Sequence, residues 1–386
     1  MDETTLRYSM KKVSISVNFF SLLIALTWGL PARLIAQEVQ PAHFGLLYPL
    51  STQGTFSPNN TNYFSLHALS GISGGERGLA VYGLAGIIKG DAEGLQVAGL
   101  VNLTEGNLSG LQVAGLLNTA GGSSEGIQIA GLTNLSRGNT PIQISGLYNN
   151  TDKSDALQIA GLVNTTGESE GVQVAGLGNF AKRSSGVQVA GLVNTAKEVN
   201  GSQISGLINR AKVVRGVQIA GLINIADSSE YPIAIINLIK TGEKRIGLGT
   251  DENLSTMLSF RSGGSKLYGL IGLGTNLQYS ELAYGFEAGL GLVLQSSNSF
   301  RMDLEAFNLF MTDFQGSEYS KSGIRLLPAL RLRSGLQLYG GPSLNFMHTE
   351  NCNRYPSGGL EIWGSNRWGD YRSLDLGYTI GIQLTL

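Results

Sequence analysis

The feature that most constrains this chain is a repeat of fifteen or sixteen residues that fills its middle. The unit reads G-[VIL]-Q-[VI]-[AS]-G-L-x-N and is followed by six or seven mostly polar residues. Nine copies agree at Gln, Gly, Leu and Asn, and a degenerate copy precedes them at 78–84. The Gln positions are Gln96, Gln112, Gln128, Gln143, Gln158, Gln173, Gln188, Gln203 and Gln218. This period is too short for βαβ units or helical hairpins.

Each unit predicts a β-strand and a turn, because Val or Ile alternates with Gln before a cluster of Gly, Ser and Asn. A single unit cannot bury its own apolar side chains, so we expect neighbouring units to stack as a parallel β-solenoid. We expect the Leu, Val and Ile columns to form its core. Gln is then expected in a row on the surface, and Gly at a tight corner. The alternative is an antiparallel meander of single strands.

The column of repeated Asn, from Asn102 to Asn224, has two interpretations. The favoured one is a hydrogen-bonded amide ladder that satisfies backbone groups at each corner, because every copy keeps the residue. The alternative is an exposed polar surface that binds a ligand.

Charge is uneven along the repeats. Residues 91–170 contain eight acids and two bases, a net charge of −6, whereas residues 182–215 contain six bases and one acid, a net charge of +5. Nearly all of these residues fall in the variable turns. The favoured interpretation is a set of solvated turns. The alternative is that the charges orient a partner or favour association between molecules.

After Tyr231 the period is lost, and longer alternating segments follow, as at 286–294, 324–332 and 378–386. About eight strands predict an antiparallel β-barrel. The face opposite the apolar residues carries Glu287, Asp303, Glu305, Arg325, Arg331 and Arg333. An outer-membrane barrel, the favoured form, would pair these charges in its lumen, whereas a soluble barrel would expose them to water. The candidates for an interfacial aromatic belt, with core positions as the alternative, are Tyr268, Tyr284, Phe300 and Tyr339.

The first 36 residues predict a signal peptide. Lys11 and Lys12 precede an apolar run over residues 13–28, and small residues follow at Ala32 and Ala36. A membrane anchor or a buried helix is the alternative. The predicted organisation is all-β, with a lead-in or cap over residues 37–77, a β-solenoid over 78–240 and an antiparallel, barrel-like domain over 241–386.

Composition and motifs argue against several classes of function. A formal charge of −1 supplies no basic field for nucleic acid. The single Cys352 cannot form an intrachain disulfide, and His43, His67 and His348 lack the spacing of metal ligands. Residues 71–75 fit G-x-S-x-G, but their turn-rich β context is not that of a nucleophile elbow. We therefore predict no enzymatic activity and no catalytic, cofactor-binding or metal-binding residues.

The repeat resembles that of the leptospiral-type surface-repeat proteins, a family also found in gut anaerobes of the Bacteroides kind. The resemblance covers residues 78–240 and extends to the lead-in at 64–66 and to the segment from 233 to 264. It implies an exported or surface location and no established enzymatic activity, and it supplies no functional residues. This chain lacks the lipidation Cys that some related proteins carry.

The sequence thus favours an exported, non-enzymatic cell-envelope repeat protein with an envelope protein or a glycan as its partner. The expected location is the outer membrane or cell surface, with the periplasm or secretion as alternatives. A pore or transport role for the barrel is one alternative function, and a glycan-active solenoid enzyme is another. The sequence does not indicate an oligomeric state.

Overall fold

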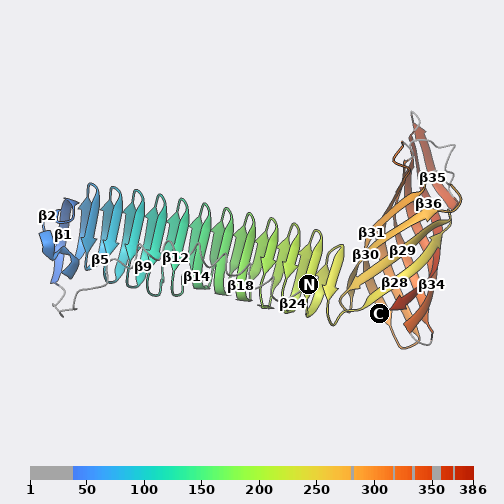
Figure 1. The fold of residues 1–386 in the computed structure, drawn as a ribbon, viewed down its shortest axis with the longest axis horizontal. Coiled ribbons are helices and arrows are strands. Elements are labelled where there is room, and N and C mark those ends of the chain that lie inside the picture. The colour runs from blue at the N-terminus through green and yellow to red at the C-terminus, as the bar shows by residue number, and fades with distance from the viewer. Residues whose placement is uncertain (1–37, 280–281, 316–317, 333–334, 350–357, 368–369) are drawn as a thin grey trace, which may run out of the picture. The chain divides into compact units, whose positions relative to one another are not determined.

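The computed structural model describes residues 38–279, 282–315, 318–332, 335–349, 358–367 and 370–386. These residues form 27 strands of a solenoid, β1 to β27, and a sheet of nine strands, β28 to β36 (Figure 1). The predicted all-β fold, a solenoid followed by an antiparallel barrel, is confirmed. The predicted signal peptide and Cys352 lie outside the described residues. Within them, no helix has the length and hydropathy of a helical membrane span.

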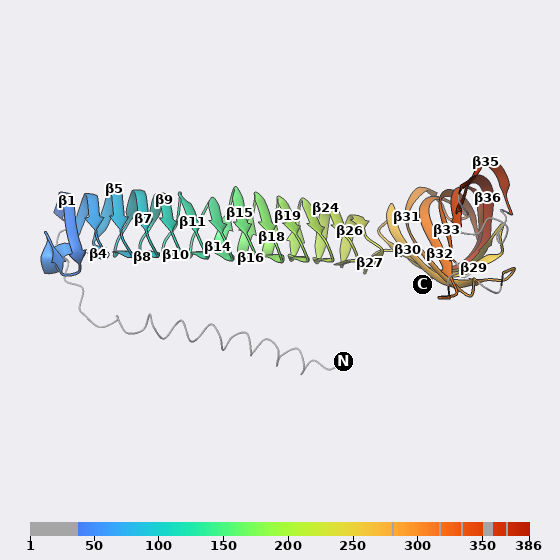
Figure 2. The same ribbon diagram turned by 90° about the horizontal axis from the view of Figure 1, so that it is seen from above.

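Each coil of the solenoid contributes strands to two parallel sheets, and successive coils overlie one another (Figure 2). The strands that carry the repeated Gln, here called the Gln sheet, are β7 (Ala92–Ala98), β9 (Leu108–Ala114), β11 (Ile127–Ala130), β13 (Ile142–Ser145), β15 (Leu157–Ala160), β17 (Val172–Ala175), β19 (Val187–Ala190), β22 (Ser202–Ser205) and β24 (Val213–Ala220). They continue into β3 (Asn60–His67) and β5 (Gly75–Tyr82) at one end and β26 (Ser228–Ile233) at the other.

The strands that carry the repeated Asn form the second sheet, here called the Asn sheet. They are β8 (Val101–Thr104), β10 (Leu117–Ala120), β12 (Thr133–Ser136), β14 (Tyr148–Ser154), β16 (Val163–Ser169), β18 (Gly178–Ser184), β20 (Val193–Thr195), β23 (Ile208–Arg210) and β25 (Ile223–Ala226). They continue into β4 (Ser70–Ser73), β6 (Ala85–Ile88) and β27 (Ile236–Ile239), while β21 (Glu198–Val199) pairs with β18 and β24.

Identical residues stack in register along both sheets. Gln128 lies beside Gln143, and Asn134 lies beside Asn149, in parallel pairing. The stacked solenoid is therefore confirmed, and the antiparallel meander is excluded.

The side chains inside the solenoid are the opposite of those expected. Gln158 and Asn164 are fully buried, as are the other members of their columns, and Ala160 lies inside with them. Ile159 and Leu162, by contrast, are 36% and 42% exposed. The predicted core of Leu, Val and Ile and the predicted surface row of Gln are both wrong. Small Ala and Ser side chains keep the two sheets close, and stacked amides satisfy one another between them.

The repeated Gly is required by the closeness of successive coils. A Cβ on Gly161 would lie 2.0 Å from the carbonyl oxygen of Gly146, one coil earlier. The same clash recurs along the column from Gly99 to Gly221. Positive φ occurs instead at glycines inside three of the Gln strands, such as Gly110 on β9.

The N-terminal end of the solenoid carries a short cap. Strand β1 (Glu38–Leu47) forms a hairpin with β2 (Leu50–Ser51) and also pairs with β3, and a 3-10 helix (Gly54–Asn59) leads into β3. The parallel ladder already includes β3 and β4, which pair with β5 and β6. The cap thus covers a sheet edge that would otherwise be open to pairing.

The C-terminal sheet closes into an eight-stranded antiparallel barrel because β36 pairs with β28. Its strands are β28 (Lys244–Asp251), β29 (Ser255–Gly263), β30 (Leu267–Asn276), β31 (Tyr284–Ser296), β32 (Phe300–Thr312), β33 (Glu318–Arg331), β34 (Leu336–Thr349) and β36 (Asp370–Thr385). The ninth strand, β35 (Leu360–Arg367), pairs with the first part of β36.

The barrel presents its apolar face outward. Leu258, Ile380 and Ile382 are about half exposed, whereas the sequence-predicted charges Glu287, Asp303, Glu305 and Arg325 are buried inside, and Arg331 is only partly exposed. The alternative orientation, with the apolar residues inward and the charges outward, is therefore wrong.

Two of the predicted belt aromatics are also placed differently from the favoured interpretation. Tyr268 and Tyr339 are buried inside the barrel, so their assignment to an interfacial belt is wrong. Tyr284 remains outside, where its ring contacts that of Phe314 with centroids 5.3 Å apart.

Candidate functional site

The interior of the barrel gathers most of its charged side chains into one half of its length, and a smaller charged group around Lys321 lies in the other half. On β32, alternate residues point inward; they are charged from Arg301 to Glu305 and apolar from Phe307 to Met311. The order of residues on β32 therefore gives this strand a charged end and an apolar end inside the barrel.

Glu305 is the centre of the charged half. Its carboxylate accepts hydrogen bonds from Arg261 Nε (2.7 Å), Arg325 Nε (2.8 Å) and Tyr268 Oη (2.7 Å). Arg325 also pairs with Glu287 at 2.8 Å. Since Glu305 is fully buried, these partners replace the water that a carboxylate otherwise requires.

Asp303 is a second acceptor in the same half. Arg245 donates to it at 2.9 Å and Arg301 at 2.8 Å, and Arg301 also pairs with Glu243. Arg245 and Arg261 are direct neighbours across β28 and β29. Two like charges at such positions repel, so the acids on β32 are needed to balance them.

A third buried group surrounds Lys321. Its ammonium pairs with Asp251 and, at 3.1 Å, with Glu252. Glu252 also accepts from Asn345 Nδ2 at 3.0 Å. The ammonium and both carboxylates are thus held by partners from different strands rather than left free for a solute.

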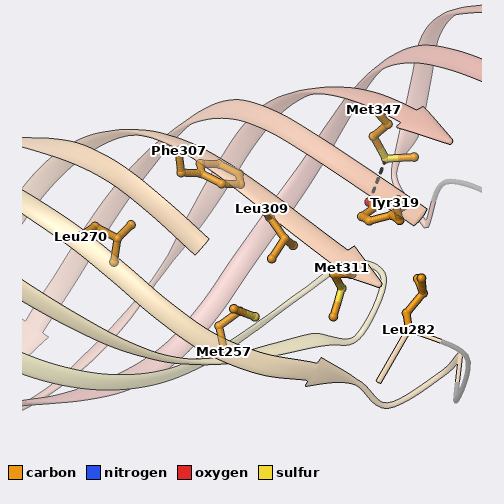
Figure 3. Close-up of a cluster of buried hydrophobic side chains, with 8 residues drawn as sticks. All are labelled: Met257, Leu270, Leu282, Phe307, Leu309, Met311, Tyr319 and Met347. Carbon is orange, nitrogen blue, oxygen red and sulfur yellow. Dashed lines mark hydrogen bonds between the residues drawn. The ribbon is translucent and has the colours of Figure 1, made fainter. Parts of the chain in front are cut away.

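Apolar side chains fill most of the other half of the lumen (Figure 3). The Lys321 group lies beside them, since Lys321 pairs with Leu309 across β33 and β32. The cluster consists of Met257, Leu270, Leu282, Phe307, Leu309, Met311, Tyr319 and Met347. Between the charged and apolar groups lies a hollow of about 20 Å³, which has room for one water rather than for a solute. An eight-stranded barrel is just wide enough for its interior to be filled in this way.

The interior of the solenoid is a pair of amide ladders. Each Gln donates to the Gln of the preceding coil, as Gln158 does to Gln143 (2.9 Å), whereas each Asn donates to the Asn of the following coil, as Asn164 does to Asn179 (3.0 Å). Asn164 also donates to the backbone carbonyl of Val174 at 2.8 Å. The Asn ladder is thereby confirmed, and the alternative of an exposed ligand surface is wrong because these side chains are buried.

The cap contains a buried cluster that sequence spacing did not reveal. His43 and His67 are distant in sequence, but their Nδ1 and Nε2 atoms lie 3.2 Å apart, and the ring of His67 stacks on that of Tyr82. Burial, and then the neighbouring His67, lower the pKa of His43 to about 4. Burial also lowers the pKa of His67. Both rings are therefore neutral at pH 7.

Glu76 lies in the same cluster and is also buried. Burial raises its pKa, although Ser65 Oγ (2.8 Å) and Asn62 Nδ2 (3.3 Å) donate to it. Ser73 of the G-x-S-x-G match is the last residue of β4 and is itself buried, so it is not placed on a strand–turn–helix junction. Within the described residues, no group of three His, Cys, Asp or Glu side chains forms a metal site.

Comparisons with known proteins supply no further assignment. No family model matches the chain, and neither the curated proteins nor the solved structures include a match. The functional argument therefore depends on the arrangement of polar and apolar side chains.

Proposed function

We propose that the protein is an exported, non-enzymatic cell-envelope repeat protein whose C-terminal barrel is held in an outer membrane. The observation that supports this most is the inverted distribution of side chains in the barrel. Charges such as Glu305 and Arg261 are paired inside, while Leu258, Leu273 and Leu330 are more than half exposed on the outer wall. In water such a wall would be an aggregation hazard, whereas in lipid it is the expected surface of a barrel.

Strand length agrees with this proposal. A tilted strand needs about 9–11 residues to cross the hydrocarbon core. Strands β31 to β34 have 13 or 14 residues and β36 has 16, while β29 and β30 have 9 and 10. Only β28, with 8 residues, is shorter than this length among the eight barrel strands. The resemblance of the repeats to surface-repeat proteins points to the same location.

The experiment is to fractionate expressing cells, wash the membranes with carbonate and compare heated with unheated samples by gel electrophoresis. We expect the full chain to stay in the membrane pellet and to migrate faster when unheated, as a closed barrel does. Recovery of folded protein in the aqueous wash would contradict the proposal.

A matched pair of variants makes this test specific to the outer wall. Ile380→Arg places a charge outside the barrel and costs about 2–4 kcal/mol if that position lies at the bilayer midplane. Ser322→Arg, also outward but on β33 where the native residue is already polar, is the control. We expect Ile380→Arg to reduce assembly more strongly than Ser322→Arg.

A pore or transport role is the second candidate, because the barrel encloses charged groups. The paired charges and the apolar cluster fill its interior, so we expect no steady conductance from the full chain in planar bilayers. A reproducible open channel would favour the pore. An assay of hydrolase and lyase activity on a panel of envelope glycans addresses the remaining alternative, for which we expect no turnover.

A further inference from the structure

The outward side of the Gln sheet is a long apolar surface, here called the apolar strip. It consists of the two residues that flank each repeated Gln, from Leu95 and Val97 on β7 to Val217 and Ile219 on β24. Of these 18 positions, 17 are Leu, Ile or Val, and the exception is Ser202. Not one of them is charged. Because the Gln side chains face inward, nothing within the described chain covers this strip.

The strip is large enough for a stable interface. Nine coils at about 4.8 Å each give a length of about 43 Å, and four residues of strand give a width of about 13 Å. The projected area is then roughly 550 Å², and the adjoining column of exposed Leu, from Leu100 to Leu222, raises it toward 800 Å². Specific protein interfaces bury about 800 Å² on each partner, whereas the largest apolar patch of a monomer is usually about 300–600 Å².

We propose that the apolar strip docks against the apolar strip of a second copy of this chain, with the two solenoids antiparallel. The repeat itself favours a second copy. The strip presents branched side chains at a constant spacing of about 4.8 Å, and only a surface with the same spacing interdigitates with it along all nine coils. An identical strip provides that match, and a two-fold axis allows it.

The charge pattern selects the antiparallel orientation. A two-fold axis in the interface can run along the solenoid, which keeps the two copies parallel and puts their variable turns on opposite edges. It can instead run across the solenoid, which makes them antiparallel and puts their variable turns along the same edge. In the second arrangement the half with net charge −6, residues 91–170, faces the half with net charge +5, residues 182–215. Attraction between these halves favours this arrangement over the first.

The antiparallel arrangement also predicts a register. Overlap of all nine coils places the middle strand, β15 (Leu157–Ala160), on the two-fold axis, so Ile159 contacts its own counterpart. Val97 at one end then lies opposite Ile219 of the other copy. In the parallel arrangement, each of these residues would instead lie opposite the same coil of the other copy.

Cross-linking of the full chain in membranes of expressing cells tests the proposal, with Cys352→Ser as the background. We expect Ile159→Cys alone to give a covalent homodimer with a short bifunctional maleimide. Val97→Cys alone should give no covalent homodimer. Co-expressed Val97→Cys and Ile219→Cys chains should give a covalent dimer of the two variants. Thr165→Cys, on the outward side of the Asn sheet in the same coil, is the control that should stay monomeric. Self-linking of Val97→Cys, links only to other proteins, or no link at any strip position would overturn the proposal.

Variants of opposite charge at position 159 distinguish a loss of dimer formation from a loss of folding. Ile159→Glu puts two carboxylates close together at the two-fold axis, and Ile159→Lys puts two ammonium groups there. Because like charges repel, each variant should lower the yield of dimer about tenfold or more. Dimer yield is read here by chemical cross-linking of the turn lysines. Co-expression of Ile159→Glu with Ile159→Lys should restore the dimer as a heterodimer, and a Thr165→Glu control should leave it unchanged. Failure of the mixed pair to restore it would count against self-association.

Discussion

Replacing a buried amide of the solenoid by an apolar side chain should destabilise it. Gln158 donates to Gln143 at 2.9 Å and accepts from Gln173 at 2.6 Å. Gln158→Leu leaves one buried acceptor and one buried donor unpaired, at a cost of about 1–3 kcal/mol each. Burial of the Leu side chain returns about 2 kcal/mol. The two unpaired groups together cost about 2–6 kcal/mol, so the expected net loss is about 0–4 kcal/mol, although the variant is more hydrophobic than the native chain.

The matched variant is Val163→Gln, which puts an amide on the outward side of the Asn sheet. Since Val163 is partly exposed and points outward, we expect its replacement to change the free energy of unfolding by less than about 1 kcal/mol. The assay is the urea concentration at which the solenoid becomes sensitive to protease, measured for the full chain. A solenoid with an apolar core predicts the reverse order, with Val163→Gln the more damaging. That order would refute the reasoning.

Three further predictions concern the coil corners, the barrel and the cap. Gly161→Ala should be strongly destabilising in the same protease assay, because its Cβ would lie 2.0 Å from the carbonyl oxygen of Gly146. Gly178→Val, which restores the residue of both neighbouring coils, should cost much less, because its Cβ would lie 3.1 Å from the exposed ring of Phe180 and 3.0 Å from the carbonyl oxygen of Val193. Glu305→Ala should lower the barrel's melting temperature on heated gels, since it leaves the buried Arg261 without its carboxylate partner, at a cost of about 3–5 kcal/mol, whereas Arg325 keeps Glu287. The cap should lose stability as the pH falls from about 6.5, where an unfolded His titrates, toward about 4, where folded His43 does, and His43→Asn should flatten that pH dependence of proteolysis.

Much of the fold was predictable because a repeat specifies its own neighbours. Nine equal copies require parallel stacking in register, and the structure pairs them in this way, as for Gln128 with Gln143. The end of the repeat and the longer alternating segments after it likewise predicted an antiparallel barrel. In both sheets, however, alternation shows only which residues share a face and not which face is inside.

The choice of inward face differs between the two parts of the chain. For the barrel, the sequence allows either the apolar or the charged face inside, and the structure has the charged face inward. For the solenoid, alternation with Val and Ile predicts Gln on the face opposite an apolar core, yet Gln158 is as deeply buried as Asn164. The signal that could have corrected this was present: Gln is as invariant as Asn across the nine copies, as a ladder requires.

The cap cluster could not be predicted from spacing. His43 lies on β1 and His67 on β3, and these strands pair outside the repeat pattern. Their proximity is a product of tertiary structure alone, so neither residue type nor sequence separation indicated it.

The central claim is that the apolar side of the solenoid strands faces solvent and the amide side faces inward. Two adjacent threonines on β16 test this claim, because the same substitution can be made at both. Thr165 points outward with Val163, whereas Thr166 is buried on the side of Asn164. In a Cys352→Ser background, Thr165→Cys should react quickly with a hydrophilic maleimide in the native full chain. Thr166→Cys should react only after denaturation. Rapid reaction at 166 with protection at 165 would show that the apolar side faces inward, and would contradict this account.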